Sequence, residues 1–398
     1  MKKLKTLLMA SAAIGLAGTA QADIKIGLAG DMSGKQSALA GPGSQVAVEM
    51  AIEDMGGEVL GEPITLVIGD NQHKAELEAS IARRWYEDED VDAIVGINLS
   101  SGAIETVHLA ERFDKVAMVS DAGSSRLVQE DCTPNHVHWG WNTYSFSAVV
   151  PKAMVEKGND KFFFLTVDYT FGHDMMADAT TNIEAAGGSV VGSVLHPLGA
   201  NDFSAYILQA QASGASVVPV INSGADTVAT IKQAGEFGVL DAGTPVIVPM
   251  IFTLADVEAL GLEATKNLRA PSSFYWGRDD ESRAWSEKFK ERFGKMPTFF
   301  QAQAYSATYH YLKAVEKAGT KDAKTVIKTL KSMEIDDFFA KNAYVREDGQ
   351  LVHDMYLVRV KTPEESEGEF DFFEVEATIS GDDAYQPMDP EACKLLQD

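Results

Sequence analysis

Short apolar runs of strand length recur along the chain and alternate with segments of helical periodicity. Five runs begin near residues 24, 64, 91, 116 and 136, and a second five begin near residues 161, 189, 216, 244 and 267. Helical patterns fall over 44–55, 75–86, 103–113, 172–186, 202–213, 224–237 and 253–261. Such alternation predicts an α/β protein with parallel sheets. Two successive sets of similar size predict two doubly wound lobes whose strand ends face a shared crevice.

The pattern changes after residue 275. Helices are expected over 279–293, 300–318 and 322–333, with no strand between them. We expect them to return to the first lobe and cover one face of its sheet, although a separate helical domain is the alternative. The segment 342–361 then predicts a hairpin with its turn at 347–349.

The first 22 residues have the pattern of a signal peptide. Three lysines precede an apolar run over about 7–17, and Ala20-Gln21-Ala22 follows, so cleavage is expected after Ala22. The run is too short to span a bilayer, and no cysteine follows the cleavage site to carry a lipid. We therefore expect an exported, soluble protein.

The composition is strongly acidic. The full chain of 398 residues has a formal charge of −25, and removal of the three signal-peptide lysines lowers it to −28. This charge disfavours nucleic acid and anionic membranes as partners. The remaining 376 residues suffice for two cores.

The two cysteines, Cys132 and Cys393, form an even set in a chain expected to be exported. This combination predicts a disulfide, which would return the C-terminal tail to the first lobe. Neither cysteine has the spacing of a metal site, and no cofactor is expected.

The stretch 91–103, VDAIVGINLSSGA, carries the first candidate chemistry. A buried strand over 92–96 is followed by Asn98, Ser100, Ser101 and Gly102, which are expected to cap a helix over 103–113. A helix N-terminus at the carboxyl end of a parallel strand favours an anionic ligand. The alternative is that these residues only cap the helix.

Several motifs together resemble the periplasmic substrate-binding proteins of ABC transporters, specifically the leucine/isoleucine/valine-binding type. They are IKIGLAGDMSG, VGINLSS, VSDAGSS, VDYTFGHD and the helix QAYSATYHYLKAV. HPLGANDFS, FYWGRDDESRAWS and REDGQLVHDMYLVRVK resemble a branch that includes binders of aromatic acids.

The resemblance implies a type I periplasmic binding fold, in which two Rossmann-like lobes joined by three crossovers close on a ligand like a hinge. It implies a first lobe of 23–142 plus 276–348 and a second lobe of 143–275 plus 349–398. It also implies a monomer that delivers its solute to a membrane permease.

The same resemblance implies the binding residues. Those expected to hold a carboxylate follow the third and fourth strands of the first lobe: Ser100, Ser101, Ala122, Gly123, Ser124 and Ser125. The first loop is expected to line one wall through Gln36, Ser37 and Ala38, unless it only connects strand to helix. The second lobe is expected to contribute an aromatic lid and further contacts through Tyr169, Phe171, Asn222, Ser223, Asp226, Ile251, Phe252 and Tyr275. The alternative for Ser124 and Ser125 is a helix cap or a turn. The alternative for Tyr169 is packing in the core.

Relatives that bind amino acids place an acidic residue, which pairs with the ligand's ammonium group, after the second-lobe strand that corresponds to the run near residue 244. Here Met250 to Thr253 contain no carboxylate, and the first acid is Asp256. Asp121 or Asp226 could substitute. We therefore expect a hydrophobic or aromatic carboxylate in preference to a branched-chain or other hydrophobic amino acid.

No enzymatic function is expected, because the metalloprotease motif HExxH and the phosphate-binding motif GxxxxGK[ST] are both missing from the sequence. The alternative to transport is a soluble protein that presents its ligand to a membrane sensor.

Overall fold

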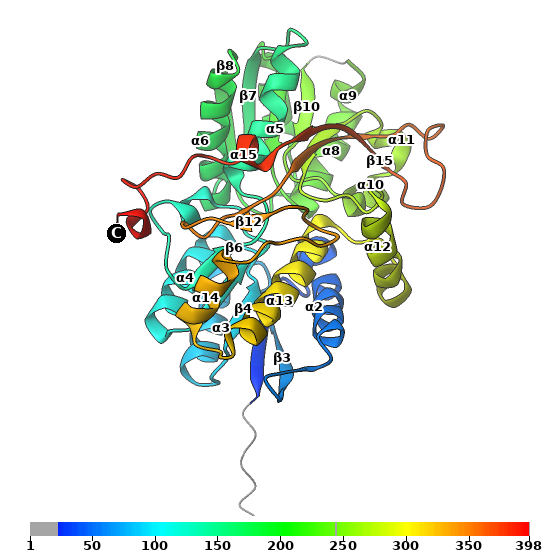
Figure 1. Ribbon diagram of the computed structural model, residues 1–398. Helices are drawn as coiled ribbons and strands as arrows, with labels where there is room; N and C mark the ends of the chain where they lie inside the picture. The colour runs from blue at the N-terminus through cyan, green and yellow to red at the C-terminus, as the bar shows by residue number, and fades with distance from the viewer. Residues whose placement is uncertain (1–22, 243–244, 398) are drawn as a thin grey trace, which may run out of the picture.

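The computed structural model describes residues 23–242 and 245–397, so the predicted signal peptide lies outside the described residues. Two α/β lobes lie one above the other in Figure 1, with the early strands and the helices α13 (Phe299–Ala318) and α14 (Ala323–Lys331) in the lower lobe and residues of the middle of the chain in the upper one. This is the doubly wound two-lobe fold that the alternating pattern predicts.

The first lobe has a six-stranded sheet in the order β2-β3-β1-β4-β5-β6, in which every pair is parallel except β2 with β3. Its strands are β1 (Ile24–Gly30), β2 (Glu58–Val59), β3 (Glu62–Asp70), β4 (Ala93–Gly96), β5 (Val116–Val119) and β6 (His136–His138). Its early helices are α1 (Ser37–Ala40), α2 (Pro42–Asp54), α3 (Ala75–Glu87) and α4 (Ser100–Phe113), followed by the 3-10 turn η1 (Ser125–Val128).

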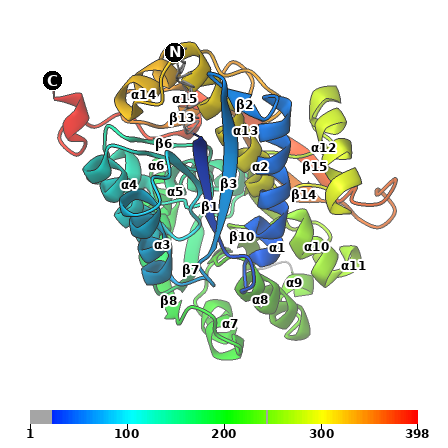
Figure 2. The same ribbon diagram turned by 90° about the horizontal axis from the view of Figure 1, so that it is seen from below.

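The helices after residue 275 belong to the first lobe. They are α12 (Asp280–Phe293), α13 (Phe299–Ala318) and α14 (Ala323–Lys331). Helix α13 packs against the sheet and against α2, α12 packs on α2, and α14 packs on α13. Figure 2 shows α3 and α4 on one side of strands β1 and β3, with α2 and α13 on the other. Tyr305 of α13 donates a hydrogen bond of 2.6 Å to Asp54 of α2, and Trp139 donates one of 3.1 Å to Ser306. Both faces of the first sheet are therefore covered.

The second lobe has a four-stranded parallel sheet in the order β10-β9-β7-β8. Its strands are β7 (Lys161–Val167), β8 (Ser189–His196), β9 (Val217–Ile221) and β10 (Val246–Pro249). Its helices are α5 (Thr143–Val155), α6 (Thr170–Ala185), α7 (Ser204–Ala212), α8 (Ala225–Glu236), α9 (Val239–Ala242), α10 (Leu254–Leu260) and α11 (Leu262–Thr265). The sequence pattern did not predict α5, which contains Pro151.

The run near residue 267 was expected to continue the second parallel sheet, and this expectation is wrong. Its strand β11 (Arg269–Ser272) instead pairs antiparallel with β14 (Met355–Val360), which pairs with β15 (Phe373–Ile379). An apolar run predicts a strand but not its partner, and β11's partner lies far along the chain. The predicted hairpin is present as β12 (Tyr344–Val345) and β13 (Leu351–Val352), antiparallel around residues 347–349.

The chain passes between the lobes after β6, after β11 and after β13, and hydrogen bonds join the first of these passages to the third. Gln350 donates a hydrogen bond of 2.8 Å to the carbonyl of Gly140. The Asn142 amide donates to the side-chain oxygens of Gln350 and of Gln386, at 2.9 and 3.0 Å. The third segment and the C-terminal tail, which includes α15 (Gly381–Ala384) and η2 (Lys394–Leu396), are thus bonded to the first passage.

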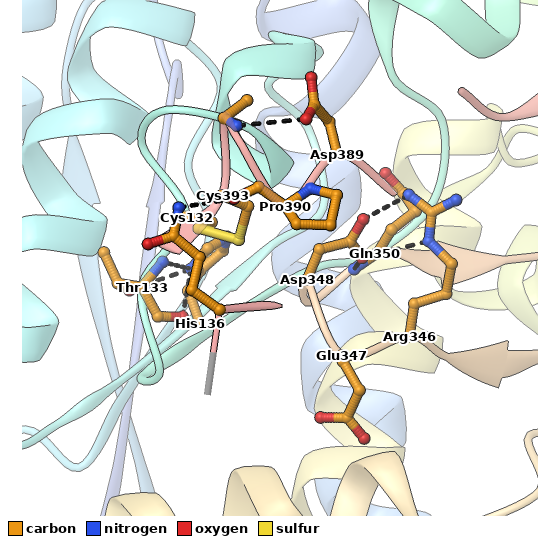
Figure 3. Close-up of a disulfide and its surroundings, with 12 residues drawn as sticks. Cys132, Thr133, His136, Arg346, Glu347, Asp348, Gln350, Asp389, Pro390 and Cys393 are labelled. Carbon is orange, nitrogen blue, oxygen red and sulfur yellow. Dashed lines mark hydrogen bonds and ion pairs between the residues drawn. A yellow bond between two sulfur atoms is a disulfide. The ribbon is translucent and has the colours of Figure 1, made fainter. Parts of the chain in front are cut away.

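Cys132 and Cys393 form a disulfide, so the tail returns to the first lobe. Figure 3 shows the bond beside Thr133 and His136, with Arg346, Asp348 and Gln350 of the hairpin region nearby. Of the helices within the described ranges, none has the length and apolarity that crossing a membrane requires.

Candidate functional site

A small cavity lies where the carboxyl ends of strands from both lobes meet. The space in it that the centre of a water molecule can occupy is only about 20 Å³, so its wall residues must move apart to admit a small-molecule ligand. The first lobe and the β6 passage contribute Gln36, Asn98, Ser100, Asp121, Gly123, Trp141 and Phe300, and the second lobe contributes Tyr169, Phe171, Ser223 and Ile251. All but Phe300, which lies in the first turn of α13, follow the ends of parallel strands.

Aromatic rings form much of the wall. Trp141 stacks on Phe146 with ring centroids 4.5 Å apart, and it meets the edges of Phe171 and Phe300 at 6.2 and 6.1 Å. Tyr169 lies 5.9 Å from Phe171, measured between centroids. Such rings offer large apolar contact area at low rotamer cost, so the wall suits a hydrophobic ligand.

Gly123 is needed where the turn after β5 passes the Trp141 ring. A Cβ at this position would lie 2.2 Å from the ring. We expect Gly123→Ala to displace Trp141 and to lower the free energy of unfolding by about 1–3 kcal/mol, measured by denaturant titration. At Gly30 an added Cβ would lie 3.7 Å from Met32, an ordinary contact, so Gly30→Ala is the matched control. Equal stability of both variants would contradict this assignment.

Three buried polar atoms of the cavity residues have no hydrogen-bond partner within the described part of the chain. They are the amide nitrogen Nδ2 of Asn98, the carboxyl oxygen Oδ2 of Asp121 and the indole nitrogen Nε1 of Trp141. We call these three the open polar atoms. Because a buried polar atom is costly without a partner, they indicate the polar groups of a ligand: acceptors opposite Asn98 and Trp141, and a donor or a shared proton opposite Asp121.

The carboxyl group of Asp121 is almost completely buried, with 3% of the residue exposed. Its other oxygen, Oδ1, accepts a hydrogen bond of 2.9 Å from Ser120. Burial raises the pKa of Asp121 to about 7, although the bond from Ser120 acts in the opposite direction. Near neutral pH this carboxyl can therefore hold a proton or give it up when a ligand arrives.

Helix α4 begins at Ser100, three residues earlier than predicted, and its N-cap Leu99 provides no side-chain cap. The prediction that Asn98, Ser100, Ser101 and Gly102 supply the cap residues of this helix is therefore wrong, since the last three lie in its first turn. The backbone N–H of Asn98 instead donates to the Glu78 carboxyl group of α3, at 3.0 Å. Ser100 lies in the first turn and lines the cavity, where an anion would also meet the helix N-terminus.

Contacts across the cavity join the two lobes. The Gln36 amide donates to the Ser223 hydroxyl, and Lys35 donates 2.8 Å to the carbonyl of Gly199. On the other side, the Ser124 hydroxyl donates to Asp174 of α6. The lobes therefore lie in a closed arrangement in which the cavity is shielded from solvent.

Seven of the residues predicted to bind a ligand line the cavity. They are Gln36, Ser100, Gly123, Tyr169, Phe171, Ser223 and Ile251. Their convergence from six strand ends is what a parallel two-lobe fold produces.

The other predicted residues lie elsewhere. In the first lobe Ser37 bonds to Gly34, Ala38 is exposed, Ser101 and Ala122 are outside the wall, Ser124 bonds to Asp174, and the N–H of Ser125 bonds to Thr143. In the second lobe Asn222 bonds to His196 and Thr230, Asp226 accepts from Gly199, Phe252 packs near Phe373, and Tyr275 lies in an outer groove. Asp256, the first acid after β10, accepts from the N–H and hydroxyl of Thr253 at the start of α10.

Three wall residues were not predicted to bind a ligand: Asn98, Trp141 and Phe300. Asn98 was interpreted only as a helix cap, and the two aromatic residues fall in patterns that also fit a strand and a core helix. The position of Asn98 just after a predicted strand, and of Trp141 near the end of the apolar run that begins at residue 136, was the signal that could have identified them.

The comparisons with known proteins agree with this architecture. The family model for the periplasmic binding proteins matches residues 23–368. A solved periplasmic binding protein from Burkholderia mallei is 41% identical with a TM-score of 0.90, and the match covers 94% of this chain and 99% of that one. A branched chain amino acid ABC transporter periplasmic ligand-binding protein from Burkholderia xenovorans is 38% identical, with a TM-score of 0.82 and coverage of 92% and 97%.

A solute-binding protein from Rhodopseudomonas palustris, solved in complex with 4-hydroxybenzoate, is 21% identical with a TM-score of 0.82 and coverage of 90% and 97%. At this identity the likeness concerns the fold alone. The resemblance that the sequence motifs predicted is confirmed by these matches.

Proposed function

The chain belongs to the periplasmic binding proteins, and we propose that it is the extracytoplasmic component of an ABC importer that captures a small hydrophobic or aromatic carboxylate. The family and fold are those of solute-binding transport proteins rather than enzymes. In this proposal the chain is exported through a signal peptide ending at Ala22, remains a monomer, and delivers its solute to a membrane permease.

The observation that carries the proposal is the pairing of an aromatic wall with open donors among the residues of the same cavity. The donors Asn98 Nδ2 and Trp141 Nε1 accompany the Ser100 hydroxyl at the N-terminus of α4. Together they suit a carboxylate, because each charge-assisted hydrogen bond contributes about 1.5–3 kcal/mol. The rings of Trp141 and Phe171 then suit the ligand's apolar body.

A specific observation favours a second candidate, a hydrophobic amino acid. The open oxygen of Asp121 could accept from an ammonium group beside the carboxylate donors. The name of the Burkholderia xenovorans relative supports the same class. Asp121 would then take the role of the acidic residue that relatives have after the strand corresponding to β10.

Binding is proposed to occur by closure of a lobe of 23–142 plus 276–348 on a lobe of 143–275 plus 349–398. The seven predicted residues that line the cavity are proposed to contact the ligand, with Tyr169 and Phe171 as the lid. Of the predicted residues outside it, Ser124 is proposed to bond across the lobes through Asp174.

A ligand screen tests the proposal. We expect benzoate, 4-hydroxybenzoate or a short hydrophobic carboxylate to raise the melting temperature, and amino acids with matching side chains to raise it less. Each amino acid is paired with its deaminated analogue in thermal-shift and calorimetric titrations. Binding of leucine or phenylalanine without binding of the analogue would reject the simple carboxylate in favour of the second candidate. Failure of both classes would reject the proposed function.

A further inference from the structure

The buried side chains of Asn71, Glu78 and Asn98 form a small network behind the cavity wall. Asn71 follows β3, Glu78 lies on α3 and Asn98 follows β4. The first two are completely buried, and Asn98 is 7% exposed. Of the three, only Asn98 lines the cavity.

The hydrogen bonds of Asn71 fix which way its amide points. Its oxygen accepts 2.9 Å from the backbone N–H of His73. Its nitrogen donates to Oε2 of Glu78 and to the side-chain oxygen of Asn98. Exchanging the oxygen and nitrogen of Asn71 would set its oxygen against two acceptors, so the observed orientation is the favourable one.

The orientation of Asn71 determines that of Asn98. Because the oxygen of Asn98 is engaged by Asn71, its nitrogen is the atom left for the cavity, and this nitrogen is one of the open polar atoms. A reversed Asn98 amide would lose the bond from Asn71 and would present an acceptor to the ligand instead of a donor.

Glu78 completes the network from behind. Its Oε2 accepts from both Asn71 and the backbone N–H of Asn98, and its Oε1 is so close to Gly102 that a Cβ there would lie 2.3 Å away. The carboxyl group of Glu78 therefore contacts both the first turn of helix α4 and the turn before it. Burial raises the pKa of Glu78 to about 8, so near neutral pH it is largely protonated and resembles a glutamine in its accepting oxygen.

We infer that Glu78 and Asn71 are positioning residues that hold the Asn98 amide with its N–H₂ group toward the cavity, where it donates to the ligand's carboxylate. The inference rests on the proposed function, since it needs a carboxylate ligand in this cavity. Both ligand candidates carry that group, so the inference holds for a simple acid and for an amino acid.

The test compares a carboxylate with its primary amide, using benzoate and benzamide, or leucine and leucinamide if the screen selects amino acids. Calorimetric affinities are measured at pH 6.5 for the wild type and for Asn71→Ala, Glu78→Ala and Glu78→Gln. We expect Asn71→Ala and Glu78→Ala to weaken carboxylate binding about ten- to hundredfold and amide binding by only about threefold, because a released Asn98 can turn its oxygen to the ligand. Glu78→Gln keeps an accepting oxygen and should retain the wild-type ratio.

Ile81→Ala is the matched control. Ile81 is buried on the same helix and packs near Gly69, and as an apolar residue it takes no part in the hydrogen bonds of the network, so its variant should lose stability without a change in the carboxylate-to-amide ratio. Melting temperatures show which variants fold. If Glu78→Ala does not fold, the carboxylate-to-amide ratio of Asn71→Ala alone tests the inference. An equal loss of both ligands, as a purely structural defect would give, overturns the inference. A wild type that binds neither pair instead overturns the proposed function, and this inference with it.

Discussion

Above pH 7, the affinity for a simple carboxylate is expected to fall about tenfold for each further pH unit, and Asp121→Asn should remove this dependence up to about pH 8, the pKa of Glu78. The free protein holds a proton on Asp121 up to a pKa of about 7. A ligand carboxylate beside the open oxygen needs that proton, because two ionised carboxylates in a buried site repel each other. Above the pKa, binding must therefore take up a proton, whereas an asparagine donates an N–H at every pH.

An amino-acid ligand reverses the sign. Its ammonium group favours the ionised form of Asp121, so binding releases a proton wherever the free carboxyl is protonated. Affinity would then fall about tenfold per unit below pH 7 and would be level above it. Asp121→Asn would also weaken an amino acid by about 2–5 kcal/mol, since it removes the partner of a buried charge.

Titration calorimetry between pH 5.5 and 9, in buffers of different ionisation enthalpy, measures both the affinity and the protons exchanged. Asp256→Asn is the matched control. Burial raises the pKa of Asp256 to about 7 as well, but this carboxyl group accepts its hydrogen bonds from the N–H and hydroxyl of Thr253 at the start of α10. Its pH profile for binding should match the wild type. Affinity independent of pH in the wild type would show that Asp121 does not meet the ligand.

The apolar pattern predicts the parallel strands of both sheets, and most of them are short buried runs, although β3 and β8 are largely half-buried or exposed. It does not predict β15, whose residues are mostly exposed or half-buried, nor the antiparallel partnership of β11. Strand pairing depends on contacts between segments far apart in the chain, which no local pattern contains.

The candidate site was predictable to the extent that it follows the topology. Ser100, Gly123 and Tyr169 line the cavity because each lies just beyond a strand end. Ser124 was chosen by the same rule, yet its hydroxyl is engaged by Asp174, an acid that another lobe brings to it. Which hydroxyls stay free for a ligand is thus decided by tertiary partners rather than by position along the chain.

The same reasoning explains why Trp141 was missed and why Asp121 was only one of two suggested acids. A tryptophan in an apolar run ordinarily belongs to the core. Here the Trp141 ring packs against Gly123, and Trp141 also lines the cavity. Asp226 was the other acid, but it accepts 2.7 Å from the N–H of Gly199 and lies 3.9 Å from Lys35. The structure leaves Asp121 facing the cavity with an open oxygen.

Loss of the disulfide is expected to reduce the free energy of unfolding by about 2–4 kcal/mol without abolishing ligand binding. The bond joins residues 261 positions apart, so it closes a loop that contains most of the unfolded chain. In the folded protein the tail is also held by other bonds: Tyr385 donates 2.9 Å to the carbonyl of Gly140, and Arg346 donates 2.7 Å to that of Gln386. These bonds should keep the tail in place after the cysteines are replaced.

The double variant Cys132→Ser/Cys393→Ser isolates this effect, since each single variant would leave a reactive thiol. Guanidinium unfolding of the variant should match that of the reduced wild type, and reductant should not change the variant further. The affinity for the ligand should stay within about threefold, because the disulfide lies outside the cavity wall and the Gly140 contacts remain. A free energy of unfolding equal to that of the oxidised wild type would mean that loss of the disulfide adds little conformational entropy to the unfolded chain. A large loss of affinity would instead mean that the tail holds the passages between the lobes in their binding geometry only while it is bonded to Cys132.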